Sequence, residues 1–162
     1  MKKTILFLIL SFSSFILPNQ WIDISSSEEE APSINIVSSE IENTIVEFNL
    51  SGFNQKSVYI NDNEYLIISF PTSASNLELG YPNLPSISKS IIIPNNGLMR
   101  TEIIGVEYVE YDNILIAPSK GNISREINPS SVNYFFDDIY LNDIYYPENS
   151  VNLREPYVLR DF

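Results

Sequence analysis

The sequence has 162 residues, of which 44% are hydrophobic and 19% charged, and this is typical of one globular domain. Its net charge of -12 repels phosphate backbones, so we expect no nucleic-acid partner. The chain contains no cysteine and no histidine, which excludes thiolate nucleophiles, Cys–His dyads, Ser–His–Asp triads, disulfides and thiolate or imidazole metal sites. We therefore expect no catalytic residues, no metal site and no cofactor, and we predict that the chain is not an enzyme by itself.

The N-terminus carries a targeting pattern. Lys2 and Lys3 precede an apolar run from Ile5 to Leu17, which serines interrupt. A basic start followed by such a run is typical of a secretory signal peptide, and the run is shorter than the roughly 20 residues of a transmembrane helix. We predict a signal peptide over residues 1–20, export of the mature chain to the extracellular space, and no stable membrane anchor.

A polar, acidic linker is predicted next, over residues 21–32, because serines and glutamates fill the stretch from Ser25 to Pro32. The remaining residues, 33–162, are predicted to form one domain. In this part Ile, Val, Tyr and Phe recur whereas Ala is scarce, which favours strands over helices.

Four short strands divided by turn residues are predicted in the first part of this domain. They cover residues 34–37, 44–50, 58–60 and 65–70. Ser51 and Gly52 are expected to interrupt the strand pattern after the second strand. Residues 61–64 are expected to form a four-residue hairpin connection between the third and fourth strands. This acidic turn lacks the number and spacing of oxygen ligands that a calcium loop needs, so plain turn chemistry is favoured.

Further strands are predicted at residues 87–93, 100–111 and 113–117, with weaker patterns at 132–136 and 157–159. A helical turn is possible at residues 137–140. Prolines and glycines stand mostly between these runs, where they end strands and set turns. Regular short strands with such turn signals predict an all-β fold, an antiparallel β-sandwich.

A series of motifs occupies the second half of the chain. It runs Gly-Tyr-Pro-Asn-Leu-Pro at residues 80–85, Ile-Ile-Ile-Pro at 91–94, Leu-Ile-Ala-Pro-Ser-Lys-Gly-Asn-Ile-Ser-Arg-Glu at 115–126, Asn-Pro at 128–129, Tyr-Pro at 146–147 and Pro-Tyr-Val-Leu-Arg-Asp at 156–161. In this order the motifs resemble the pro-domain of the gingipains, secreted cysteine peptidases of Bacteroidetes-type bacteria. The resemblance runs from about residue 35 to residue 162 and implies a jelly-roll-like sandwich. Its structural motif positions are Gly80, Pro82, Leu84, Pro85, Pro94, Pro118, Pro129 and Arg160.

One polar loop within the motif series is a candidate functional site. Pro118 ends a strand, Gly121 permits a sharp bend, and the next turn starts at Pro129. The resemblance implies an inhibitory loop made by Ser119, Lys120, Gly121, Ile123, Ser124 and Arg125, with Arg125 entering the specificity pocket of the peptidase. A guanidinium suits this role because it forms a two-pronged hydrogen-bonded pair with a carboxylate. Lys120 is the competing cation, but its place directly before Gly121 matches the scaffold of the motif.

The resemblance also implies a partner and a role. The partner would be the catalytic domain of a gingipain-like cysteine peptidase, in cis or in trans, and the domain would inhibit the zymogen cleft and assist folding. The chain ends at residues 158–162 as a strand just begun, and neither a catalytic cysteine nor a histidine follows. We therefore expect a fragment whose sandwich lacks its last strands.

Two other functions have weaker support in the sequence. A secreted adhesion or carbohydrate-binding module could use tyrosines and Trp21 to stack on sugars, although the tyrosines lack a platform-like spacing. A glycosidase would need paired carboxylates on one face. Asp137 and Asp138 are adjacent, so on a strand they would point to opposite faces.

Overall fold

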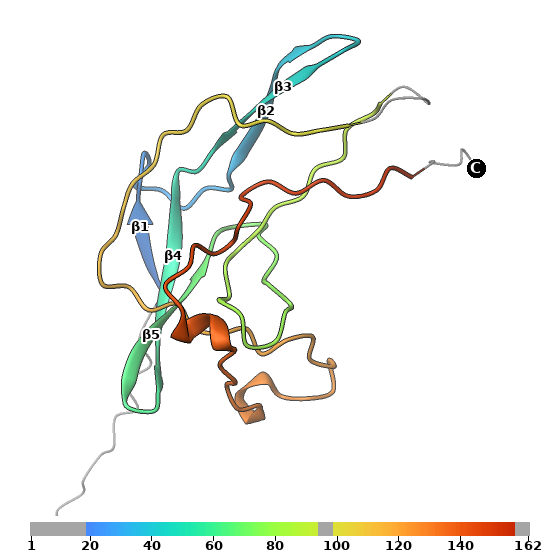
Figure 1. Ribbon diagram of the computed structural model, residues 1–162. Helices are drawn as coiled ribbons and strands as arrows, with labels where there is room; N and C mark the ends of the chain where they lie inside the picture. Colours follow the sequence, from blue (N-terminus) through green and yellow to red (C-terminus); the bar gives the residue numbers. More distant parts are fainter. Residues whose placement is uncertain (1–18, 94–98, 158–162) are drawn as a thin grey trace, which may run out of the picture.

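The fold is built around one long central strand. In the computed structural model, which describes residues 19–93 and 99–157, strand β4 (Gly52–Ile60) pairs with β1 (Gln20–Asp23) on one side and β5 (Asn63–Ser69) on the other. Both pairings are antiparallel, and the strand order is β1-β4-β5 (Figure 1). The expected antiparallel all-β class is confirmed.

The interruption predicted after the second strand is present, because Leu50 and Ser51 lie outside both strands, and Gly52 already begins β4. A Cβ atom on Gly52 would lie 2.5 Å from the carbonyl oxygen of Ile22 and 2.5 Å from the ring of Trp21. Only glycine therefore lets β1 approach β4 this closely. Trp21 and Ile22, at the start of the predicted linker, consequently lie in a strand.

The hairpin between β4 and β5 has two connecting residues, where four were predicted. Ile60 pairs with Asn63, and the two residues between them, Asn61 and Asp62, have φ values of 49° and 65°. Two-residue hairpins of this type require positive φ at both central positions, because their backbone twist then matches that of the strands. Asn and Asp tolerate this conformation better than most residues.

A second sheet consists of β2 (Ser33–Ser39) and β3 (Thr44–Asn49), whose register shifts between Ile36 and Ser38. Both strands were predicted. The hairpin projects beyond the three-stranded sheet (Figure 1). Its apolar side chains, such as Ile36 and Phe48, are largely exposed.

The strands predicted at residues 87–93, 100–111, 113–117 and 132–136 do not form ladders in the described part of the chain. Within these segments Ile116 forms an isolated bridge to Leu66, and two further bridges, Ala74 to Ser86 and Pro82 to Pro118, lie just outside the predicted ranges. Proline lacks the donor that a ladder requires, which explains why the Pro82–Pro118 bridge does not grow. Most of the weaker pattern at residues 157–159 lies outside the described residues, as does the predicted signal sequence up to residue 18.

Two short 3-10 helices, η1 (Pro129–Ser131) and η2 (Asp138–Leu141), follow in the last third of the chain. η2 confirms the expected helical turn near Asp137. The side chain of Asp137 caps this helix by accepting a hydrogen bond of 3.1 Å from the backbone amide of Ile139. Within the described ranges, no helix has the length and apolar character needed to cross a membrane.

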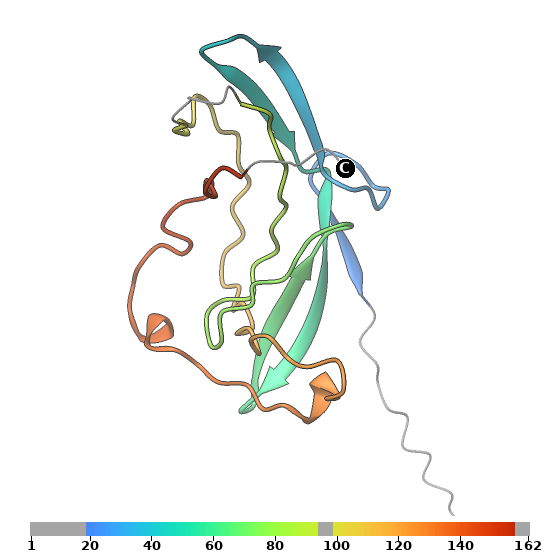
Figure 2. The same cartoon turned by 90° about the vertical axis from the view of Figure 1, so that its right-hand side faces the viewer.

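The buried core is small. Its apolar members are Phe53, Ile60, Phe70 and Ala117, and the adjoining Pro118 and Ser119 are the largest fully buried side chains. Extended chain from the second half of the domain lies beside β4 and β5 (Figure 2). Leu66 of β5 exchanges backbone hydrogen bonds with Leu115 and Ala117, which attaches this chain to the edge of the sheet.

Candidate functional site: the loop from Ser119 to Pro129

Two motifs that are distant in the sequence form the base of the candidate loop. Residues 80–83 lie antiparallel to residues 117–119 through three backbone hydrogen bonds. Gly80 donates to the Ser119 carbonyl at 2.9 Å, Ser119 donates to the Tyr81 carbonyl at 2.7 Å, and Asn83 donates to the Ala117 carbonyl at 2.9 Å. The proline motif and the loop motif are therefore parts of one local scaffold.

Ser119 fixes the start of the loop from a buried position. Its side chain is only 2% exposed. The hydroxyl donates a 2.5 Å hydrogen bond to the Asn76 carbonyl and accepts a 3.1 Å bond from the Gly121 amide. Gly121 has φ of 73°, a left-handed conformation that glycine adopts without strain. Ser119 and Gly121 together set the bend at which the loop leaves the scaffold.

Asn76 connects this bend to the end of the domain, and no sequence motif indicated it. Its amide nitrogen donates to the Pro82 carbonyl at 3.1 Å and to the Tyr146 hydroxyl at 2.7 Å. Burial raises the pKa of Tyr146, while the hydrogen bond from Asn76 opposes that rise. These bonds reach residues six and seventy positions away, so the sequence around Asn76 does not indicate them.

Gly80 is enclosed by a later segment. Its φ is 86°, and a Cβ there would lie 2.6 Å from the ring of Phe135 and 3.0 Å from the amide nitrogen of Asp137. The Asp137 amide in turn donates to the Gly80 carbonyl at 3.2 Å. Gly80 of the scaffold thus packs against Phe135 and Asp137, in the segment that follows the loop.

Arg125 occupies the tip of the loop. The Ile127 amide donates a 3.0 Å hydrogen bond to the Ser124 carbonyl, which closes a turn with Arg125 and Glu126 in its centre. Both central residues are exposed, whereas Ile123 is half-buried against the domain. The long cation predicted at the working end of the loop is therefore accessible to solvent.

Lys120, the competing cation, is engaged by the chain itself. Its Nζ donates a 2.8 Å hydrogen bond to the Pro129 carbonyl and lies 4.2 Å from the centroid of the Tyr134 ring. Pro129 opens η1, whose N-cap Asn128 accepts a 2.9 Å bond from the Ser130 amide. Lys120 consequently bridges the two ends of the loop.

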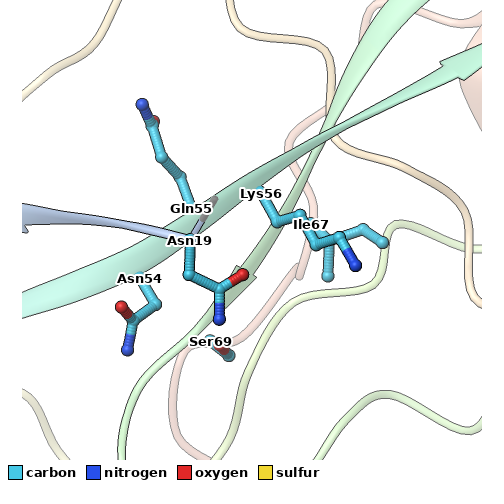
Figure 3. A pocket seen from close by; sticks show the side chains of 6 residues that line it. All are labelled: Asn19, Asn54, Gln55, Lys56, Ile67 and Ser69. Atoms are coloured by element: carbon cyan, nitrogen blue, oxygen red, sulfur yellow. The ribbon is translucent and has the colours of Figure 1, made fainter. Parts of the chain in front are cut away.

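The described residues hold no group of His, Cys, Asp and Glu side chains suited to a metal ion. A hollow of about 300 Å³ lies over β4 and β5, lined by Asn19, Asn54, Gln55, Lys56, Ile67 and Ser69 (Figure 3). None of the predicted site residues lines it.

Of the remaining structural motif positions, Leu84 and Pro85 are half-buried, and Pro94 and Arg160 lie outside the described residues.

The fold is that of a peptidase pro-domain. It is similar to a solved structure described as the complex of Porphyromonas gingivalis RgpB pro- and mature domains, with a TM-score of 0.76 and 29% identity. The match covers 82% of this chain and 69% of that chain. The family model Propeptide_C25 matches residues 25–162, so the chain belongs to the Propeptide_C25 family.

Similar proteins include two gingipains of Porphyromonas gingivalis. Gingipain R2 is 29% identical over 130 residues, covering 80% of this chain and 18% of the relative. Gingipain R1 is 35% identical over 91 residues, covering 56% of this chain and 9% of the relative. The chain therefore spans only a minor part of the length of these relatives.

Proposed function

We propose that this domain inhibits a gingipain-like cysteine peptidase by presenting Arg125 to the specificity pocket of the peptidase. The observation that carries the proposal is the exposure of Arg125 at a closed turn on a loop anchored at both ends. A catalytic domain as partner is supported by the similar solved structure, which is described as a complex of pro- and mature domains.

The chemistry of inhibition follows from the loop. A guanidinium can form two parallel hydrogen bonds with a pocket carboxylate, which lysine cannot reproduce. The loop is already ordered by Ser119 at one end and Pro129 at the other, so binding sacrifices less conformational entropy than a free peptide would. No catalytic residue of the domain is needed for this role.

Inhibition kinetics with Gingipain R2 as the probe test the proposal. The full chain should lower the peptidase activity, and Arg125→Ala should weaken inhibition by about 30-fold or more, the cost of losing a buried charge pair. Arg125→Lys should restore only part of it, because the two-pronged geometry is lost. Arg154→Ala is the matched control, since Arg154 is exposed in another segment. Unchanged inhibition by Arg125→Ala would contradict the assigned role.

We also propose that the chain is exported and that it assists folding of its peptidase. Export is supported by the basic and apolar pattern of residues 2–17. Cell fractionation of a tagged chain, with N-terminal sequencing of the product, tests export. For the folding role, denatured Gingipain R2 is refolded with and without the chain. An unchanged yield of active peptidase would contradict that role.

A further inference from the structure

The two ends of the loop are held by separate sets of hydrogen bonds. At the first end, the buried Ser119 hydroxyl bonds to the Gly121 amide. At the second end, Asn128 caps η1, and its carbonyl accepts bonds from the amide and the hydroxyl of Ser131. These contacts are local, so neither of them sets the distance between the two ends.

Lys120 supplies a connection between these ends. It directly follows Ser119, and its Nζ reaches the Pro129 carbonyl at 2.8 Å. The same carbonyl accepts a 3.3 Å bond from the Val132 amide, so it belongs to the turn of η1. The ammonium also lies 4.2 Å from the centroid of the half-buried Tyr134 ring, within the range of a cation–π interaction.

We propose that Lys120 is a positioning residue that closes the base of the loop and thereby holds Arg125 in its binding conformation. The inference rests on the proposed function of Arg125. Joining positions 120 and 129 restricts the conformations open to the residues between them, because a closed loop has lower entropy than an open one. Lys120 then affects the peptidase only through Arg125 and makes no contact with the pocket.

The geometry also separates the roles of the two cations. If Lys120 occupied the specificity pocket, its ammonium would have to leave both the Pro129 carbonyl and the Tyr134 ring. Arg125 is exposed and can enter a pocket without such rearrangement. The chain therefore uses its compact ammonium for an internal bond and its planar guanidinium for recognition.

Amide hydrogen exchange of the free full chain tests the closure without any peptidase. Lys120→Met keeps the length of the side chain and removes its charge. It should speed exchange of the amide of Ile127 about tenfold, since the charged hydrogen bond and the cation–π contact are both lost. Lys120→Arg should largely preserve protection, and Lys89→Met, an exposed lysine elsewhere, should leave it unchanged. Equal exchange in Lys120→Met and the unchanged chain would overturn the proposal.

Inhibition of Gingipain R2 tests the link to Arg125. Lys120→Met should weaken inhibition about tenfold when Arg125 is present and have no further effect when combined with Arg125→Ala. An equal effect of Lys120→Met in both backgrounds would show direct contact with the peptidase and overturn the positioning role. If Arg125→Ala has no effect by itself, the proposed function fails, while the exchange measurement still decides whether Lys120 closes the loop.

Discussion

Replacing Ser119 with alanine is the sharpest test of the scaffold below the loop. The substitution removes only the hydroxyl group of Ser119, a residue that is 2% exposed. It joins the Asn76 carbonyl and the Gly121 amide, at 2.5 Å and 3.1 Å. Both groups lose their partner in the variant.

The size of the effect follows from burial. Leaving one buried polar group without a partner costs about 1–3 kcal/mol. Gly121 is half-buried, so water can reach its amide and part of that cost is recovered. We therefore expect Ser119→Ala to lower the free energy of unfolding by about 2 kcal/mol. In a domain of this size the melting temperature should fall by roughly 5–10 °C.

The measurement is thermal and urea unfolding of the full chain, followed by circular dichroism and by the fluorescence of Trp21. Ser124→Ala is the control, because the Ser124 hydroxyl is exposed and accepts a long bond of 3.4 Å from the Glu126 amide. This control should change stability by less than about 0.5 kcal/mol. Indistinguishable melting of Ser119→Ala and the unchanged chain would refute the reasoning about the buried hydroxyl.

Two further predictions concern residues that support the scaffold. Gly80→Ala should destabilise the domain by about 2–4 kcal/mol, since its φ of 86° disfavours a Cβ and Phe135 occupies the space. Gly105→Ala, where a Cβ meets nothing within 4 Å, should be near neutral in the same urea titration, and equal midpoints for the two variants would contradict the packing at Gly80. Tyr140→Phe should cost about 1 kcal/mol at neutral pH by removing the 2.9 Å bond to the Ile116 carbonyl. Burial raises the pKa of Tyr140 above its ordinary 10.0, so the unfolded chain loses this proton first and stability falls as pH rises above about 10. The Tyr140→Phe variant should lose less stability between pH 9 and about 11 than the unchanged chain. If the free energies of unfolding of the two proteins fall equally with pH, burial does not raise the pKa of Tyr140.

Local patterns predicted most of the regular structure. Alternation and β-branched residues indicated β2, β3 and β5, and turn residues placed the hairpin near Asn61. The helical turn expected at residues 137–140 is also a local feature, because the side chain of Asp137 caps it. Such features depend on neighbours in sequence, so a single chain displays them.

The sequence pattern predicted strands less reliably where strand pairing depends on segments that are distant in the sequence. The break after the second strand was predicted, but not that Gly52 itself starts β4 by pairing with β1, which lies more than twenty residues earlier. The long segment at residues 100–111, predicted as a strand, belongs to no strand in the described part of the chain. Alternation shows that a segment suits a strand, while a strand also needs a partner edge, and periodicity contains no information about that edge.

The sequence by itself determined the class of this protein and the loop that carries its candidate site. The absence of cysteine and histidine excluded thiolate nucleophiles and Ser–His–Asp triads from these residues, and the motif order indicated the propeptide family. Only the tertiary structure showed that Ser119 is buried against Asn76 and that Lys120 is bound to Pro129, which leaves Arg125 as the exposed cation of the loop. These contacts join residues that are nine to forty-three positions apart, and they exist only because the folded backbone brings the two motifs into one scaffold.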